Sequence, residues 1–519
     1  MILITSGTFV SEEFRNEIGQ LPPTFLPLAN KRLYEHQIGI LKKAFPQEQI
    51  YLSLPQEFFP LSGDLRMLSQ FNISTVSLPY DLALGDSLLL AINLIGHYHE
   101  PLVLLHGDTL LENLPVEADV IAVSQFSEDY NWEIEYTSQN EAAWVGFFSF
   151  SKTDLLAKSL AKARGNFVKG VRYYQAEMPL QIQNVNSWSD LGHLNSYYQT
   201  RANHTTERNF NRLSIKDGLV RKSGTDRMKI TMEANWFESI PPSLKKYVPQ
   251  FIQKHDSPFQ TYYEIEYLPS LPLSELWVFG LKEKYFWVMI FNNINRILEE
   301  FQDLDYQTIF HQRTNKVQKD FEELVRVKTC ERLLNYTKLT EDNWNSETTL
   351  NGVKLPSIQK IITECSDFVI NLPSKISFSH GDLCFSNILY DTRSKKIKLI
   401  DPRGLATQGD CFSIGDARYD IAKLTQSVIG GYDHIVCGYF TLNEVSSLNF
   451  EFSVEVDVSL YTAQDAFLDS VVGGYRPHDL LPLVVLLFLS MIPLHSESSH
   501  RQRAFLANAL RIYSLWKEI

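Results

Sequence analysis

Short apolar runs rich in aliphatic residues alternate with longer segments of helical spacing over the first 200 residues. The runs predict strands and the longer segments predict helices, with strands at residues 2–4, 49–54 and 102–105 and helices at residues 32–45 and 87–98. Strands that alternate with helices are typical of a largely parallel sheet, whose ligands bind at the carboxyl ends of the strands. We therefore expect an α/β domain with a mostly parallel sheet over residues 1–200.

From residue 211 the pattern changes to a short β-rich region that is followed by mainly helical sequence. Residues 213–215 and 219–222 flank a Lys-Asp-Gly turn and predict a hairpin, and residues 262–268 alternate like a strand. Residues 229–239 between them have helical spacing. The pattern favours an α+β domain over residues 211–519, with a small β-rich lobe and a larger helical lobe.

Two further segments complete this organisation. The polar stretch from Tyr198 to Arg208 predicts a linker, which we place at residues 201–210. The most apolar stretch, residues 480–492, is short for a bilayer span and contains Pro482, so it predicts a buried helix. We expect no membrane span.

Composition narrows the class of protein. With 519 residues the chain is too long for one ordinary core, and its net charge of −13 argues against general nucleic-acid binding, which needs a basic surface. A small anionic substrate needs only a local basic pocket. The five cysteines lack CxxC spacing, and the chain opens without a basic leader, so we expect a cytoplasmic protein with reduced thiols. A homo-oligomer is left open.

One motif in the second half carries most of the chemistry. His380-Gly381-Asp382 is followed by Asn387, and a later apolar run ends at Asp401. Phosphoryl transfer of the kinase type needs an Asp beside the acceptor hydroxyl, and an Asn and a second Asp that hold Mg²⁺ against the phosphates. Two apolar runs, 388–390 and 397–400, predict a hairpin that returns Asp401 to the Asp382 loop. The alternative is a plain loop tripeptide and a turn residue, but the full spacing is far more specific.

This motif resembles the HGDxxxxN loop and following metal-binding Asp of the aminoglycoside phosphotransferase and choline kinase family. The resemblance implies a protein-kinase-like fold, ATP as donor, Asp382 as catalytic base, and Asn387 and Asp401 as Mg²⁺ ligands. In such a fold Lys222, on the predicted hairpin, would reach the ATP phosphates. Glu233, on the predicted helix, would pair with Lys222. The alternative for both is an ordinary solvated side chain.

In the first half, His106-Gly107-Asp108-Thr109 directly follows a predicted strand. Three segments, 22–33, 84–87 and 188–192, accompany it and resemble the PKxLxPVxGKPL, base-contacting and WxDxG segments of sugar-phosphate nucleotidyltransferases. The resemblance implies that Asp108 and Asp190 hold Mg²⁺. It also implies that Gly7 in the opening loop and Gly85 in the base-contacting loop bind a nucleotide, either CTP or UTP.

The first half also departs from that family. Its opening loop should read GxGxR, yet here only Gly7 and a more distant Arg15 remain, and Glu12 and Glu13 stand where phosphate would lie. The early lysine of the family falls on Pro23. Loss of a cation beside a developing phosphate charge lowers rates strongly. Two interpretations therefore stay open: an active nucleotidyltransferase, or a degenerate domain kept for binding, assembly or regulation.

The segment after Asp401 offers weaker candidates. Asp420 begins an apolar-periodic run, and we expect its carboxylate to cap a helix. Asp416 and Arg418 either line the acceptor site or lie in a surface loop, and His495 is interpreted as a core or surface histidine.

The sequence as a whole predicts a bifunctional enzyme that phosphorylates a sugar, choline or similar alcohol and then activates the phosphate as a nucleotide conjugate. Such steps resemble precursor supply for capsule and other bacterial surface polysaccharides. The alternatives are a small-molecule kinase with a non-catalytic first domain, or a scaffold in which both sites are degenerate.

Overall fold

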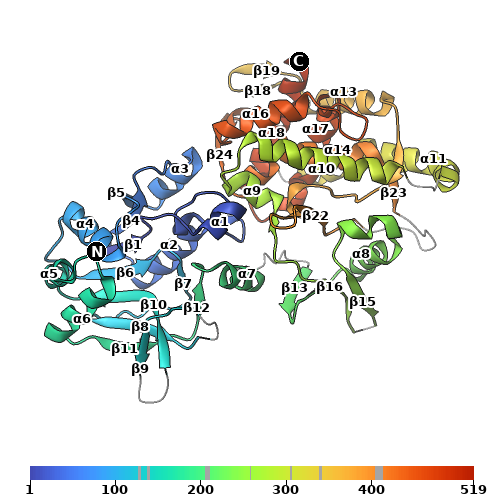
Figure 1. The fold of residues 1–519 in the computed structure, drawn as a ribbon. Helices are drawn as coiled ribbons and strands as arrows, with labels where there is room; N and C mark the ends of the chain where they lie inside the picture. The colour runs from blue at the N-terminus through green and yellow to red at the C-terminus, as the bar shows by residue number, and fades with distance from the viewer. Residues whose placement is uncertain are drawn as a thin grey trace. The chain divides into compact units, whose positions relative to one another are not determined.

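The computed structural model describes residues 1–126, 130–136, 141–204, 211–257, 259–303, 307–337, 340, 342–403 and 413–518. The chain divides into two compact units, Met1–Thr206 and Glu207–Ile519. Figure 1 shows the chain as a ribbon with its helices and strands labelled, and each unit is described by itself below.

An eight-stranded sheet forms the centre of the first unit, in the order β11-β8-β10-β6-β1-β4-β5, with β9 paired to β10. β1 pairs in parallel with β4 and β6, and β4 pairs in parallel with β5. β10 is antiparallel to both of its neighbours, β6 and β8. The predicted mostly parallel sheet is therefore confirmed, with β10 as an inserted antiparallel strand. The strands are β1 (Ile2–Thr5), β4 (Ile50–Pro55), β5 (Ile73–Leu78), β6 (Leu102–His106), β8 (Val120–Ser124), β9 (Ile134–Tyr136), β10 (Glu141–Phe150) and β11 (Gln181–Asn184).

Helices of the first unit pack against this sheet through aliphatic and aromatic side chains. One core joins strand residues such as Leu104 and Phe148 to Leu88 of α4 and Leu160 of α5. α4 begins three residues before the predicted helix and ends at Ile95, because Gly96 adopts a left-handed φ of 78° and stops the helix before Tyr98. The helices are α1 (Glu12–Glu17), α2 (Leu33–Ala44), α3 (Ser62–Gln70), α4 (Leu84–Ile95), α5 (Thr153–Ala163), α6 (Phe167–Glu177) and α7 (Leu194–Asn203).

The predicted linker is in part helical. α7 includes residues 198–203, because Tyr197 and Tyr198 are buried and tie this segment into the first unit. The Tyr197 hydroxyl donates to the carbonyl of Pro27 at 2.6 Å. Residues 205–210 of the predicted linker lie outside the described residues.

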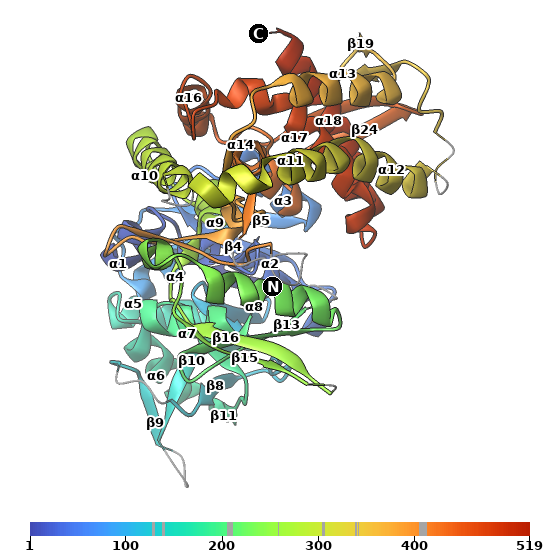
Figure 2. The same ribbon diagram turned by 90° about the vertical axis from the view of Figure 1, so that its right-hand side faces the viewer.

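The second unit opens with the small β-rich lobe. Its antiparallel sheet has the order β13-β14-β16-β15, formed by β13 (Asn211–Lys216), β14 (Leu219–Gly224), β15 (Phe251–Asp256) and β16 (Thr261–Glu266). α8 (Arg227–Ser239) lies along this sheet (Figure 2). Asp226 caps the helix, because its side chain accepts from the Lys229 amide at 3.1 Å. The predicted hairpin, helix and strand are thus confirmed.

The rest of the second unit is the helical lobe, which together with the small lobe gives the α+β architecture that the sequence predicted. Its helices are α9 (Leu273–Phe279), α10 (Lys284–Gln302), α11 (Gln307–Glu322), α12 (Thr329–Thr337), α13 (Ile358–Asn371), α14 (Ala417–Val428), α15 (Tyr432–Val436), α16 (Val458–Leu468), α17 (Leu481–Met491) and α18 (Ser499–Glu518), with a π-helical turn, η3 (Glu323–Lys328), between α11 and α12. Its short strands are β17 (Leu271–Pro272), β18 (Thr348–Leu350), β19 (Val353–Leu355), β20 (Ile376–Phe378), β21 (Ile388–Asp391), β22 (Lys396–Leu399), β23 (Ile414–Asp416), β24 (Phe440–Ser446) and β25 (Asn449–Val454).

The apolar segment near the end of the chain forms the core of this lobe. α17 packs against α13, α14 and α18. The 19-residue helical segment Pro477–His495 is long and apolar enough to cross a membrane, yet 72% of its apolar window is buried inside the protein. Such burial is typical of a core helix, as the sequence predicted.

Candidate active sites

A loop and a hairpin bring Asp382 and Asp401 together in the second unit. β21 and β22 pair in antiparallel register, with Ile388 opposite Leu399. Beyond the strands, the Ile400 amide donates to the Asn387 carbonyl at 3.0 Å, and His380 Nε2 lies 3.0 Å from the Ile400 carbonyl. These bonds fix Asp401, whose φ is +55°, beside the loop. The hairpin predicted from sequence therefore forms and returns Asp401 to the Asp382 loop.

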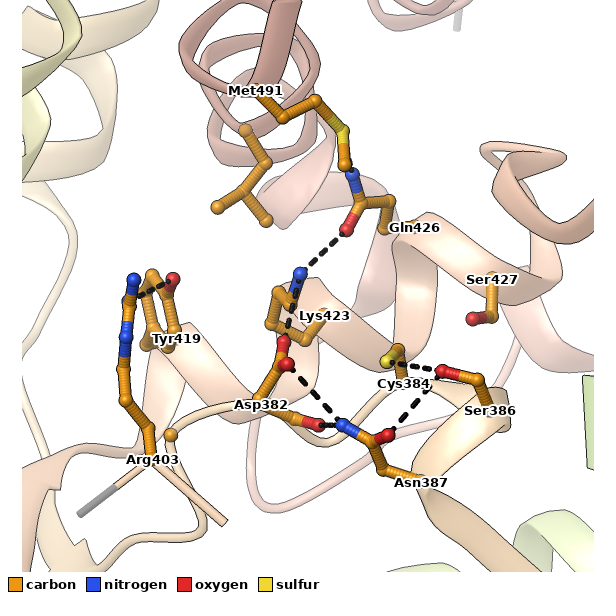
Figure 3. Close-up of polar contacts among 12 residues, drawn as sticks. Asp382, Cys384, Ser386, Asn387, Arg403, Tyr419, Lys423, Gln426, Ser427 and Met491 are labelled. Atoms are coloured by element: carbon orange, nitrogen blue, oxygen red, sulfur yellow. Dashed lines mark hydrogen bonds and ion pairs between the residues drawn. The ribbon is translucent and has the colours of Figure 1, made fainter. Parts of the chain in front are cut away.

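Asp382 is held from two sides (Figure 3). Asn387 Nδ2 donates to the Asp382 backbone carbonyl at 2.8 Å and to its Oδ2 at 3.2 Å. Lys423 Nζ, on α14, lies 2.9 Å from Asp382 Oδ1. Burial would raise the pKa of Asp382, but the Lys423 ammonium outweighs it, and the pKa falls to about 2. The carboxylate is therefore ionised at neutral pH and fixed in direction.

Lys222 and Glu233 form a buried ion pair that reaches Asp401. Lys222 Nζ lies 2.7 Å from Glu233 Oε2 and 2.9 Å from Asp401 Oδ1, and the Lys222 and Glu233 side chains are each only 4% exposed. The Tyr263 hydroxyl donates to Glu233 Oε2 at 3.1 Å. Burial opposes the ammonium, but the carboxylates of Asp401 and Glu233 prevail, and the pKa of Lys222 is raised. Neither side chain is the solvated surface residue that the sequence left as an alternative.

The sequence analysis expected Asp420 to cap α14, but the structure shows that it does not. The helix begins earlier, at Ala417, and Asp416 caps it by accepting from the Arg418 amide. Asp420 is buried in the first turn and accepts from the amides of His380 at 2.8 Å and Gly381 at 2.7 Å. Its carboxylate therefore braces the loop that carries Asp382.

The other weak candidates, Asp416, Arg418 and His495, have structural surroundings. Asp416 and Arg418 pair at 2.6 Å with side chains that are 1% and 3% exposed, and Arg418 donates to the Val369 carbonyl. They form neither an acceptor-site lining nor a surface loop, because the pair is enclosed. His495 packs edge-on against Phe505, which agrees with a structural histidine.

Sequence reasoning missed Lys423, together with Arg403 and Tyr419. Arg403 donates from Nη1 to the Tyr419 hydroxyl at 2.9 Å, beside Asp382. A signal was present, because Lys423 lies three residues after Asp420 and thus on the same face of α14. Both side chains of that face contact the Asp382 loop.

In the first unit, a small ribbon brings Asp108 and Asp190 together. β7 (Thr109–Leu111) pairs with β12 (Trp188–Asp190), so that Asp190 lies opposite Thr109. A Cβ atom placed on Gly192 would lie 2.6 Å from Asp108 Oδ2 and 3.3 Å from Asp190 Oδ1. The carboxylates of Asp108 and Asp190 therefore converge on the same place beside Gly192. Burial and the charge of Asp190 raise the pKa of Asp108 to about 6, and His193 Nδ1 lies 2.8 Å from Asp190 Oδ2.

The two glycines assigned to nucleotide binding lie near the beginning of α4. A Cβ on Gly7 would lie 3.1 Å from Ser87 Oγ, so the opening loop and this helix terminus are adjacent. A Cβ on Gly85 would lie 2.7 Å from the Gly165 carbonyl oxygen, which accepts from the Gly85 amide at 3.1 Å. Gly85 is thus needed for close packing of α4 on the turn at Gly165, a structural role that the sequence did not suggest.

Both sites have donors that suit Mg²⁺, which binds one or two carboxylates together with phosphate oxygens and keeps several waters. The carboxylates of Asp108 and Asp190 form one such set, and Asn387 with Asp401 forms the other. Within the described ranges, no group of three or more His, Cys, Asp or Glu side chains is placed to hold a metal ion. The two pairs of side chains therefore fit a Mg²⁺ ion whose other ligands are phosphate oxygens and waters.

Comparison with known proteins identifies part of the chain. Residues 264–402 match the family model for choline/ethanolamine kinase, and this range includes Asp382, Asn387 and Asp401. A search of curated proteins gave no significant match. The second unit therefore carries a choline kinase-like domain, and the chain is an enzyme of the phosphotransferase class.

Solved structures similar to each part share little sequence with this chain. An ethanolamine kinase from Plasmodium vivax is 14% identical, covers 60% of this chain and 84% of its own length, and has a TM-score of 0.34. A choline kinase from Streptococcus pneumoniae is 12% identical, covers 60% of this chain and 91% of its own length, and has a TM-score of 0.33. A nucleoside-diphosphate-sugar pyrophosphorylase from Vibrio cholerae RC9 is similar to the N-terminal part. It is 14% identical, covers 39% of this chain and 99% of its own length, and has a TM-score of 0.33.

Proposed function

We propose that the second unit transfers the γ-phosphoryl group of ATP to a hydroxyl group of a small sugar or alcohol. Two groups of contacting side chains carry this proposal. In the first, Lys222 pairs with Glu233 and Asp401. In the second, Asn387 bonds to Asp382. Kinase chemistry needs a lysine held by a glutamate, a metal-binding Asp and a separate Asp at the acceptor. All five side chains are placed by direct contacts of 3.2 Å or less.

Each residue has a distinct part in the proposed reaction. Asp382 orients the acceptor hydroxyl and takes its proton as the new bond to phosphorus forms. Lys222 binds the phosphates of ATP, and Glu233 keeps its ammonium in place. Asn387 and Asp401 would hold Mg²⁺, which offsets the negative charge of the phosphates when it is bound. The Lys423 ammonium, 2.9 Å from Asp382 Oδ1, keeps this carboxylate ionised and oriented toward its role as hydrogen-bond acceptor for the hydroxyl.

Asp382→Asn tests this function. The substitution removes the charge and the proton acceptor but keeps the shape, so we expect kcat for phosphorylation to fall by about 10²- to 10⁴-fold. The affinity for ATP should change little. Asp391→Asn, at the end of β21, is a matched control whose kcat should stay at the parental value. Near-parental kcat in Asp382→Asn would exclude this role for Asp382.

We propose further that the first unit activates a phosphorylated product as a nucleotide conjugate, with CTP or UTP as donor. The convergence of Asp108 and Asp190 on Gly192 supports it, because a shared Mg²⁺ there would join the nucleotide to the attacking phosphate. The competing proposal is a non-catalytic binding or assembly domain, favoured by Glu12 and Glu13 in the opening loop. A route of this kind would work in the cytoplasm and supply capsule or other surface polysaccharides.

Release of pyrophosphate decides between these two proposals. The purified chain is incubated with Mg²⁺, each nucleoside triphosphate in turn, and a panel of phosphorylated sugars and alcohols. An active first unit releases pyrophosphate with CTP or UTP, and Asp190→Asn abolishes the release without changing ATP-dependent phosphorylation. If no combination releases pyrophosphate, the first unit is a binding or assembly domain.

A further inference from the structure

A cavity with a volume of about 360 Å³ lies where the two lobes of the second unit meet. Its lining comes from η2 (Pro242–Tyr247), α10 and the hairpin of β21 and β22. η2 follows α8 of the small lobe, and it packs against α10 and β22 of the helical lobe. None of the described residues that line the cavity belongs to the candidate active sites, so the cavity is a separate feature of the molecule.

Five cationic side chains line this cavity, although the net charge of the chain is −13. They are Lys246, Arg296, Lys395, Lys396 and Lys398. Of the nine lining residues that the structure describes, none is an Asp or a Glu. A cavity lined by charge of one sign focuses its electric field and attracts ligands of the opposite sign, here anions.

Direct contacts hold the walls of the cavity together. Lys398 Nζ donates to the Val248 carbonyl at 2.8 Å, which joins β22 to the end of η2. Lys246 Nζ lies 2.9 Å from Glu300 Oε2, and the Tyr247 hydroxyl donates to Glu300 Oε1 at 2.6 Å, which joins η2 to α10. The cavity is therefore built by contacts between three elements rather than by one exposed loop.

The lysines of the hairpin are crowded on one wall. Lys396 and Lys398 lie two residues apart in β22, so they project from the same face of the strand. Lys395 precedes them at the end of the turn, and its side chain is exposed. Burial lowers the pKa of Lys398, Glu266 opposes this change, and the charge of Lys396 adds to it. An anion among these ammonium groups would remove their mutual repulsion.

Three carboxylates near the cavity each have a partner of their own. Glu300 is bound to η2 as described above. Asp391, opposite Lys396 in the hairpin, accepts from the Ser394 hydroxyl at 2.6 Å. Glu266 accepts from the Gln250 amide at 3.1 Å. These carboxylates fix the surrounding turns and strands, and the five cations that line the cavity outnumber them.

We propose that this cavity binds a small polyanion of the phosphate type: pyrophosphate, or a compound that carries a pyrophosphate group. Arg296 on α10 and Lys396 on β22 belong to different walls, so a ligand with two negative groups suits them better than a single phosphate. The volume also exceeds a single phosphate group, since one water occupies only about 30 Å³. Guanidinium and ammonium groups both donate charge-assisted hydrogen bonds to phosphate oxygens. The inference does not depend on the reaction proposed for either unit.

Calorimetric titration of the full chain tests the inference. Inorganic phosphate, pyrophosphate and ADP are titrated in the presence of EDTA, so that the sites proposed to use Mg²⁺ bind phosphates weakly. We expect the Kd for pyrophosphate to be lower than that for phosphate by about 10-fold or more, because the second phosphate group adds charge-assisted hydrogen bonds. Comparison of ADP with pyrophosphate, scored only for the binding that Lys396→Gln weakens, distinguishes a nucleotide from the free anion.

Variants assign the binding to this cavity. Arg296→Gln and Lys396→Gln should each raise the Kd for pyrophosphate about 10-fold or more, while Lys396→Arg, which keeps the charge, should stay within about 3-fold of the parent. Lys354→Gln removes one charge from the exposed strand β19 and is the matched control, whose Kd should not change. Thermal unfolding of each variant without ligand excludes a general loss of structure.

Three results would overturn the inference. If no probe binds, the cavity is not an anion site. If the parent, Arg296→Gln and Lys396→Gln share one Kd for pyrophosphate, the anion binds elsewhere on the chain. Sedimentation with vesicles of phosphatidylglycerol and phosphatidylcholine provides the third test: the chain should stay in the supernatant, and vesicle binding that Lys396→Gln abolishes would assign the cavity to a membrane surface instead.

Discussion

Asp382 is oriented by two neighbours of different origin. Asn387 belongs to the same loop, five residues further along, and Lys423 belongs to α14. The first contact follows from local spacing, whereas the second depends on how the helix packs against the loop. Since the Lys423 side chain is only 12% exposed, its ion pair with Asp382 is partly shielded from solvent. The attraction between the two charges is therefore screened less than in a fully exposed pair, although the Asp382 side chain is 40% exposed.

Loss of the Lys423 ammonium should reduce turnover more than binding. In Lys423→Met the Asp382 carboxylate keeps Asn387 but loses its charged partner, so we expect kcat to fall about 10- to 100-fold with KM for ATP unchanged. Lys423→Arg should restore part of kcat, because a positioning role needs the charge. A parallel loss of kcat in both variants, with lowered thermal stability, would indicate a merely structural role.

The buried carboxyl of Asp433 links stability to pH. Burial raises its pKa to about 6, and within the described part of the chain its Oδ2 has no hydrogen-bond partner. The folded chain therefore binds this proton more tightly than the unfolded chain, and the free energy of unfolding falls as pH rises from about 4 to about 6. The side chain in Asp433→Asn stays neutral at every pH. At pH 7 the free energy of unfolding of this variant should therefore exceed that of the parent by up to about 3 kcal/mol, since each unit of pKa shift corresponds to about 1.4 kcal/mol.

Denaturant unfolding at pH 5 and pH 7 measures this gain for the second unit. The variant should be stabilised more at pH 7 than at pH 5. Asp469→Asn, which alters an exposed carboxylate on the same lobe, serves as control and should shift neither value. An equal effect of Asp433→Asn at both pH values would contradict the linkage.

At the scale of elements, close packing of α4 depends on a missing side chain. Gly85 and Gly39 are both helical glycines, but a Cβ on Gly85 would meet the backbone of Gly165 and Phe167 at 2.7–3.0 Å, whereas a Cβ on Gly39 meets nothing within 4 Å. Gly85→Ala should therefore destabilise the first unit by about 1–3 kcal/mol. Gly39→Ala should stabilise it by about 0.5–1 kcal/mol. Thermal unfolding gives both values, and equal effects would contradict this packing.

Elements with a strong local signal were predicted well from the sequence. The hairpin that ends before Asp401 and the helix of Glu233 have clear periodicity and clear turn residues. The beginning of α14 was misplaced because Asp416 and Asp420 both suit a helix N-terminus, and only the buried loop beneath Asp420 decides between them.

At the scale of the whole molecule, the division at residues 206 and 207 suggests that each unit contains its own core. We expect fragments 1–206 and 207–519 to fold separately, each with a cooperative thermal transition. The fragment 207–519 should phosphorylate its acceptor with kcat within about 2-fold of the full chain, because all five residues of the proposed kinase site lie in it. Circular dichroism and the ADP assay measure both properties, and a fragment that stays unfolded would contradict this independence.

The place of α17 in the core has a consequence for synthesis of the chain on the ribosome. α17 emerges before α18, yet α18 covers part of its apolar surface, with Phe505 packed near Phe488. The helical lobe therefore cannot close until residues up to α18 have left the exit tunnel, whereas residues 1–206 can fold while translation continues. During that interval the segment 477–495 exposes the surface that chaperones and the membrane-insertion machinery bind, so premature termination in α18 would yield an aggregation-prone product.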